Sequence, residues 1–124
     1  MKLRVAIHCE NINKVSDFYK QILGLSEIGR FEAHNGYDGI MLSKDDSDWH
    51  LELTQNGIIH ESVRDLENVI VFYPDNEEEF ISIEEQITSN EVPTFVHPNP
   101  YWKDNGIGIL DPEGNRIIVN NTNF

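Results

Sequence analysis

Apolar and polar residues alternate along the first part of the chain with two periodicities, one typical of strands and one typical of helices. Alternation at every second position predicts strands over Leu3–Cys9, Tyr37–Ser43 and Trp49–Thr54, and a weaker pattern of the same kind covers Leu25–Ala33. After the first strand and a polar break, apolar residues at helical spacing predict a helix that stops at Gly24, because glycine readily adopts the left-handed conformation of a helix end. The first part is therefore predicted to be one strand, one helix and three strands.

The second part of the chain repeats this order of elements. Asn68–Tyr73 is an apolar run that predicts a strand, and Pro74-Asp75 ends it. The acidic segment that follows has three apolar residues at helical spacing, and carboxylates in a first helical turn are stabilised by the helix dipole. A helix is therefore expected there, and a short strand over Val92–Val96 is expected after it.

The strongest local pattern is a turn sequence between two β-rich runs. Gly106–Leu110 and Asn115–Val119 flank the cluster Asp111-Pro112-Glu113-Gly114. Aspartate opens such turns by accepting hydrogen bonds from the backbone that follows, proline presets φ, and glycine supplies the positive φ that closes the turn. The segment is predicted to be a β-hairpin.

Corresponding positions in the two parts lie at a nearly constant separation. Val5 and Val69 are 64 residues apart, and Glu52 and Ile118 are 66 residues apart. A polar segment without periodicity lies between the two parts. We therefore predict a single α+β domain of two βαβββ modules, the first over residues 1–56 and the second over 67–124, with a linker at 57–66.

Composition narrows the classes of partner and the compartment. The chain has 124 residues and a formal net charge of −13, which disfavours binding to nucleic acid or to anionic membranes and favours a cationic partner if charge matters to function. Its single cysteine, Cys9, excludes an intrachain disulfide. No apolar run is long enough to span a bilayer, and Lys2-Leu3-Arg4 interrupts any signal-peptide pattern, so a cytoplasmic protein is expected.

Sequence motifs near both ends of the chain resemble those of a known protein superfamily. The opening, with Val5-Ala6-Ile7, Phe18-Tyr19 and Leu23-Gly24-Leu25, resembles that of the vicinal oxygen chelate superfamily of glyoxalases, extradiol dioxygenases and bleomycin-resistance proteins. The closing hairpin, Asp111-Pro112-Glu113-Gly114-Asn115, is similar to that of the same superfamily. The resemblance implies that the two modules form a curved mixed sheet with an open cup, and it implies a homodimer.

The metal-using members of this superfamily hold an ion with four ligands, typically His, Gln or Glu, from four strands that face the cup. Matched by motif, these positions are occupied here by Arg4, Glu52, Asn68 and Ile118. Only Glu52 is a good match, and a divalent ion needs three or more protein donors. Arg4 would also place a fixed positive charge at the position of the ion. The resemblance therefore implies a fold whose metal site is lost, and no cofactor is expected.

Arg4 and Glu52 are informative together. The family fold places their strands side by side, so that a guanidinium and a carboxylate would meet on the floor of the cup. One interpretation is that the pair neutralises itself and holds the strands together. The other is that the pair offers an orienting group to a polar ligand. The sequence leaves both open.

Other side chains are candidates for ligand contact. By alternation His8 and His50 face the cup and could be neighbours, which with Glu52 would allow a relocated divalent-metal site. Tyr101 and Trp102 lie in a Pro-rich loop over residues 97–102, just before the hairpin that walls the cup in the family.

The second half is expected to contribute an apolar wall. Phe72 and Ile70 alternate onto the cup side with Asn68, and Ile118 is expected there as well. Such a lining suits an apolar or aromatic ligand with one polar handle.

Three functions remain open at this point. The first is metal-independent binding of a small molecule, possibly cationic or aromatic, in the cup. The second is a lyase, isomerase or dioxygenase-type enzyme with a degenerate or relocated metal site, in which Glu52 is the catalytic base or a surviving ligand; a carboxylate beside Arg4 would be a poor base near neutral pH. The third is a structural or regulatory dimer with a vestigial cup.

Overall fold

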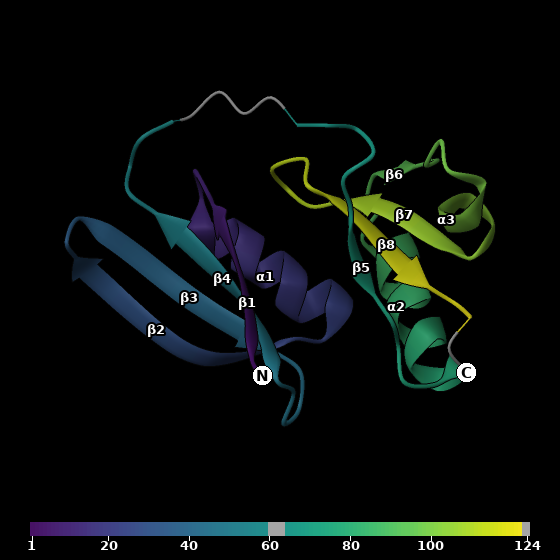
Figure 1. The fold of residues 1–124 in the computed structure, drawn as a ribbon, viewed down its shortest axis with the longest axis horizontal. Helices are drawn as coiled ribbons and strands as arrows, with labels where there is room; N and C mark the ends of the chain where they lie inside the picture. Colours follow the sequence, from purple (N-terminus) through teal and green to yellow (C-terminus); the bar gives the residue numbers. More distant parts are fainter. Residues whose placement is uncertain (60–63, 123–124) are drawn as a thin grey trace. The chain divides into compact units, whose positions relative to one another are not determined.

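The chain consists of two units, Met1–Glu61 and Ser62–Phe124, in a computed structural model that describes residues 1–59 and 64–122 (Figure 1). The elements of the first unit are β1 (Leu3–His8), α1 (Ile12–Leu23), β2 (Ser26–His34), β3 (Tyr37–Ser43) and β4 (Trp49–Gln55). Those of the second unit are β5 (Ile70–Phe72), α2 (Glu77–Ser89), β6 (Thr94–Phe95), α3 (Pro100–Asp104), β7 (Gly106–Leu110) and β8 (Arg116–Asn120). The predicted α+β class and the repeated order of strand, helix and three strands are confirmed, with α3 as an addition.

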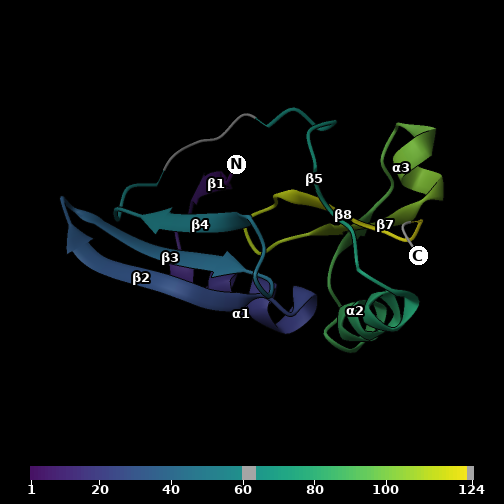
Figure 2. The ribbon, with the colours of Figure 1, turned by 60° about the horizontal axis from the view of Figure 1, so that its bottom comes forward.

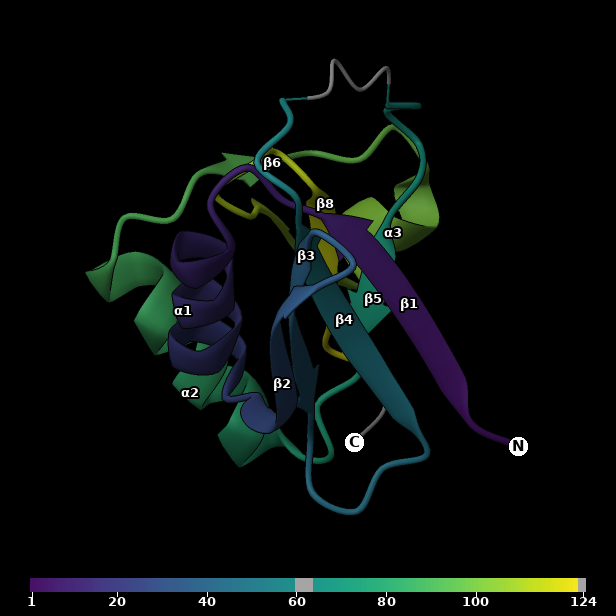
Figure 3. The ribbon, with the colours of Figure 1, turned by 90° about the vertical axis from the view of Figure 1, so that its left-hand side faces the viewer.

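The first unit is a four-stranded sheet in the order β1-β4-β3-β2, with β1 parallel to β4 and the other pairs antiparallel. Helix α1 covers one face, where Ile40, Leu42, Leu51 and Leu53 are buried (Figure 2). Strand β1 lies at the edge of the sheet beside β4 (Figure 3). The helix begins at an Asn11 cap and ends at Gly24, whose φ of 69° is left-handed, as the sequence predicts.

Side chains that alternate with this core point to the opposite face of the first sheet. Paired residues on neighbouring strands share a face, so Arg4 lies with His50, and Ala6 lies with Glu52 and Met41. We call this the distal face, because it faces away from α1.

The second unit has the same layout, with strand order β5-β8-β7-β6 and a parallel β5–β8 pair. Among its described residues, α2, β7 and β8 contribute these buried aliphatic side chains: Ile83, Ile87, Ile109, Ile117, Ile118 and Val119. The predicted hairpin is confirmed, although its second strand begins one residue later than expected, at Arg116.

Strand β5 is shorter than predicted and has a different register. It covers only Ile70–Phe72, and Asn68 lies in a turn in which its N–H donates to the carbonyl of Asp65 at 3.1 Å. Val71 is the residue that pairs with Ile118. The expectation that Asn68, Phe72 and Ile118 line one face was therefore wrong, because alternation within each strand does not fix the register between strands.

The segment predicted as a Pro-rich loop also differs from expectation. Its second half forms the short helix α3, in which Pro100 occupies the first turn and the side chain of Asn99 accepts from the N–H of Tyr101. Proline is favoured in a first helical turn because its missing N–H would be unpaired there anyway. Across the described ranges, no helix has the length and hydropathy needed to cross a membrane.

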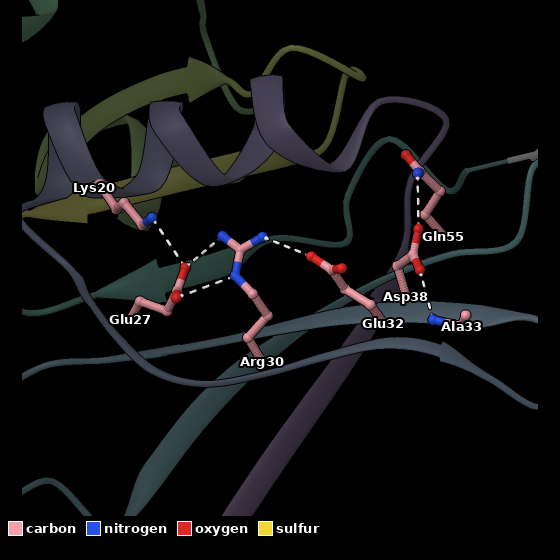
Figure 4. Close-up of polar contacts among 7 residues, drawn as sticks. All are labelled: Lys20, Glu27, Arg30, Glu32, Ala33, Asp38 and Gln55. Atoms are coloured by element: carbon pink, nitrogen blue, oxygen red, sulfur yellow. Dashed lines mark hydrogen bonds and ion pairs between the residues drawn. The ribbon is translucent and has the colours of Figure 1, made fainter.

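A charged network joins α1 to β2 on the face that α1 covers (Figure 4). The Glu27 carboxylate accepts from Arg30 Nη2 at 2.8 Å and from Lys20 Nζ at 3.1 Å. The hydrogen bond from Arg30, followed by that from Lys20, lowers the pKa of Glu27 from 4.5 to about 2.

Replacing Glu27 with glutamine is expected to lower the free energy of unfolding at neutral pH by less than about 1 kcal/mol, because the network is largely solvated. The pKa of Glu27 is lower in the folded state than in the unfolded state. The stabilisation from its carboxylate is therefore complete above pH 4.5 and is lost as the pH falls towards about 2. Urea titrations of both proteins between pH 7 and 3 would measure it. Glu32→Gln is the matched control, because Glu32 is 74% exposed and 4.0 Å from Arg30. A Glu27→Gln penalty that grew on acidification would contradict this account.

Candidate functional site

Three polar side chains meet on the distal face where β1 and β4 run parallel. Arg4 on β1 pairs with His50 on β4, and Glu52 lies two residues after His50 on β4. Arg4 Nε donates a hydrogen bond to His50 Nε2 at 2.7 Å, and Arg4 Nη1 is 3.8 Å from Glu52 Oε1. The expected pairing of Arg4 with Glu52 is present, and His50 joins it.

The hydrogen bond assigns the roles of the two ring nitrogens of His50. Arginine Nε carries a hydrogen and cannot accept, so Nε2 of His50 is the acceptor in this bond. With Nε2 as the acceptor, the ring hydrogen is on Nδ1. In the part of the chain that the structure describes, His50 Nδ1 has no acceptor.

Arg4 and Glu52 differ sharply in their access to solvent. The Arg4 side chain is 55% exposed, whereas that of Glu52 is 12% exposed. Their 3.8 Å separation is about 1 Å longer than a charge-assisted hydrogen bond. The guanidinium is thus the accessible group of this centre, and the carboxylate lies largely covered below it.

An apolar area adjoins the polar centre on the same face. Met41 pairs with Glu52, and its methyl group lies over Gly29, where an added Cβ would be 3.0 Å away. The ring of Phe31 covers Gly39 so closely that an added Cβ would be 2.2 Å from it. Because Gly29 and Gly39 have no side chains, the side chains of Met41 and Phe31 can lie directly on the sheet above them.

His8 does not join this centre. It pairs with Thr54, four positions along the strand from the Arg4–His50 pair, which corresponds to about 13 Å at a strand rise of about 3.3 Å. Its Nε2 lies 3.0 Å from Asn56 Oδ1, and that oxygen also accepts from the N–H of Ile58, so His8 is the donor. The alternative in which His8 and His50 are neighbours does not hold, because β1 and β4 pair in this register.

The candidates of the second unit are dispersed within that unit. Asn68 is exposed in its turn, Phe72 lies on the face of Val119, and Ile118 is buried on the other face. Tyr101 and Trp102 are on α3, with ring centroids 4.8 Å apart, and Tyr101 is half exposed.

His97, from the same segment, is a structural residue. It is 3% exposed, its Nδ1 accepts from the N–H of Asn99, and its Nε2 donates to the carbonyl of Glu67. Both ring nitrogens therefore hold local backbone in place.

The residues present do not fit a divalent ion. Among residues 1–59 and 64–122, no group of three or more His, Cys, Asp or Glu side chains is placed to hold a metal. On the distal face His50 and Glu52 are two possible donors, and the acceptor nitrogen of His50 already binds Arg4. Two donors beside a fixed cation fall short of what zinc or related ions require.

Sequence reasoning missed part of this centre. The sequence suggested His8 as a possible neighbour of His50, and the contact between His50 and Arg4 was not predicted. Neither Met41 nor Phe31 was considered. Alternation places Arg4 opposite the row of Leu3, Val5 and Ile7, and His50 opposite Leu51 and Leu53. No sequence signal aligns Arg4 with His50 or places Met41 and Phe31 on the same face, because these depend on the pairing of the strands.

Family models match both halves of the chain. The YycE-like N-terminal domain matches residues 3–54, and the YycE-like C-terminal domain matches residues 67–121. Protein YycE of Bacillus subtilis (strain 168) is 34% identical over 122 residues, which cover 98% of this chain and 88% of YycE.

Solved structures agree with this assignment. A crystal structure of a Bacillus subtilis YycE protein has a TM-score of 0.82 at 32% identity, covering 98% of this chain and 89% of that one. Leishmania major glyoxalase I has a TM-score of 0.76 at 18% identity over 98% and 86% of the two chains. A FosX fosfomycin resistance protein from Listeria monocytogenes, complexed with Mn(II) and a dihydroxypropylphosphonic acid, has a TM-score of 0.69 at 14% identity over 94% and 88%. The last two show a shared fold. The chain therefore belongs to the YycE-like family, and its two units have the glyoxalase/bleomycin-resistance fold of the vicinal oxygen chelate superfamily.

Proposed function

We propose that this protein binds a small molecule without a metal ion, and that Arg4, His50 and Glu52 hold the polar group of that ligand. The observation that carries the proposal is the position of the guanidinium. It bonds to His50, faces Glu52, and still leaves half of its side chain exposed. A positioned polar group beside an apolar surface is the usual construction of a small-molecule site.

The apolar surface beside this centre supports a ligand with an apolar body. Met41 adjoins Glu52, whereas Phe31 lies further along the same face, level with Thr54. An aromatic ligand held at Arg4 would gain from contact with the thioether of Met41. Ligand contact by Tyr101 and Trp102 is a separate proposal that concerns the second unit alone, and a homodimer remains the proposed assembly.

A second candidate is an enzyme of the lyase, isomerase or dioxygenase type with Glu52 as its base. One observation favours it: Glu52 is mostly covered, and its carboxylate accepts no hydrogen bond within the described ranges. The position of Glu52 counts against this candidate, because a base must reach the proton that it removes, and the Glu52 side chain is only 12% exposed with a guanidinium 3.8 Å away.

Metal content and metal-dependent unfolding distinguish the two candidates. We expect the purified protein to contain far less than one divalent ion per chain. Its melting temperature should be the same within about 1 °C in EDTA and in Zn²⁺, Ni²⁺, Mn²⁺ or Fe²⁺, since a site-bound ion would stabilise the folded state by mass action. About one ion per chain, with a melting temperature that EDTA lowers, would overturn metal-independent binding and favour the enzyme.

A further inference from the structure

We infer that the ligand group bound at Arg4 and His50 is an anionic oxygen group, a carboxylate or phosphate, on a small molecule with an apolar or aromatic body. This inference rests on the proposed function and specifies its ligand. The observation is a surplus of hydrogen-bond donors on the accessible side of the centre.

The donors can be counted from the contacts. A guanidinium has five N–H donors, and within the described ranges those of Arg4 make one hydrogen bond, from Nε to His50, and one loose ion pair to Glu52. His50 adds Nδ1–H, which has no acceptor in the same ranges. An oxyanion accepts several such donors at once, whereas a cation accepts none.

Glu52 does not satisfy these donors. A carboxylate that saturates an arginine approaches it at about 2.8 Å, usually through two parallel hydrogen bonds. Here the shortest separation is 3.8 Å, and the Arg4 side chain is 55% exposed. Glu52 therefore orients the guanidinium from the covered side and leaves its outer edge for a ligand.

The negative net charge of the chain is unevenly distributed. Residues 62–124 carry twelve Asp and Glu against three Lys and Arg, whereas residues 1–61 carry ten against six. Interactions between exposed charges are largely screened beyond about 8 Å at physiological ionic strength. The contacts of Arg4 and His50 therefore decide the preference of the site more than the charge of the chain does.

The chain offers a specific reporter of binding at this face. It contains two methionines, Met1 and Met41, so a sample labelled with ¹³C at the methionine methyl groups should give two resonances. Met41 adjoins Glu52, and Met1 is fully exposed ahead of β1 and serves as the internal reference.

Three probes of the same shape test the charge preference. Benzoate, benzamide and benzamidine share one ring and differ in charge, from negative through neutral to positive. We expect benzoate to shift the Met41 methyl resonance with a Kd at least about tenfold lower than that of benzamide, a difference of about 1.4 kcal/mol. Benzamidine should leave Met41 unshifted. Phenyl phosphate, compared with benzoate, identifies which oxyanion the site prefers.

Variants assign the preference to Arg4. Arg4→Gln should weaken benzoate binding about tenfold, and Arg4→Lys should restore only part of it, because lysine keeps the charge and loses the forked donors. Arg30→Gln is the matched control: it removes one arginine from the face of the same sheet that carries α1, and benzoate binding should persist. His50→Gln provides a second test if Arg4→Gln does not fold.

The outcomes separate the two proposals. Preference for benzamidine, or benzoate binding that Arg4→Gln leaves unchanged, would overturn the anion inference and retain small-molecule binding. If none of the probes moves Met41, the anion inference is overturned. The proposed function is also overturned if, in addition, a chemically diverse fragment screen moves neither Met41 nor the backbone signals of Arg4, His50 and Glu52.

Discussion

Replacing Asp111 with alanine is expected to lower the free energy of unfolding of the second unit by roughly 3–5 kcal/mol. Asp111 is 4% exposed, and its carboxylate holds the turn between β7 and β8. Oδ1 accepts from the N–H groups of Glu113 and Asn115 at 2.9 Å, and Oδ2 accepts from Asn115 Nδ2 at 2.6 Å. Alanine would leave these donors without their acceptor in a partly buried turn, which costs more than the loss of a solvated contact.

The two tryptophans allow this loss to be measured in one unit. Trp49 belongs to the first unit and Trp102 to the second, so urea unfolding followed by fluorescence in a Trp49→Phe background reports on the second. Asp104→Ala is the matched control: it removes an exposed aspartate for which no side-chain partner is present in the described ranges, and it should change stability by less than about 0.5 kcal/mol. Equal midpoints for Asp111→Ala and Asp104→Ala would show that the carboxylate does not hold the hairpin.

The same turn explains why some of the fold was predictable. Asp111 and Gly114 encode their conformation locally: the aspartate binds the next backbone N–H groups, and the glycine has a φ of 82°. The Asn11 cap and the Gly24 end of α1 are local in the same way. The hairpin and the first helix could therefore be identified from the order of residues alone.

Register between parallel strands could not be identified in this way. Alternation assigned Phe72 and Ile118 to one face, yet β8 pairs Ile118 with Val71. The pairing of β5 with β8 joins segments about 47 residues apart, and it is set by packing of the whole sheet and not by any residue in β5. Correct strands with an uncertain register gave a partly wrong assignment of residues to the faces of the sheet.

The candidate site shows the same limit. Arg4 and Glu52 were identified by matching positions to the family motifs, where Glu52 fits the expected residue and Arg4 departs from it, and the structure places the two together. The Arg4–His50 hydrogen bond depends on the β1–β4 register and on the direction of two side chains, which composition does not contain. The guanidinium of Arg4 makes this centre cationic, and the hydrogen bond to His50 holds it in position.

Arg4→His is expected to convert this centre into a divalent-metal site. The substitution removes the fixed positive charge, releases His50 Nε2 from its hydrogen bond, and adds an imidazole opposite His50 on the neighbouring strand. Two imidazoles and the Glu52 carboxylate are a donor set that zinc accepts with water in the fourth position. At a hundredfold excess of Zn²⁺ over its Kd, we expect about 2.7 kcal/mol of stabilisation, measured as a rise in melting temperature that EDTA reverses.

The control must remove Arg4 without adding a ligand. Arg4→Leu leaves two protein donors, which are too few to hold a divalent ion, so its melting temperature should not respond to Zn²⁺ or EDTA. A zinc response in Arg4→Leu would mean that His50 and Glu52 recruit other donors and that the guanidinium alone keeps the metal out. No response in Arg4→His would mean that the β1–β4 geometry, and not the charge of Arg4, prevents metal binding. A response confined to Arg4→His establishes that removal of the guanidinium and addition of a third donor are both needed to turn this face into a metal centre.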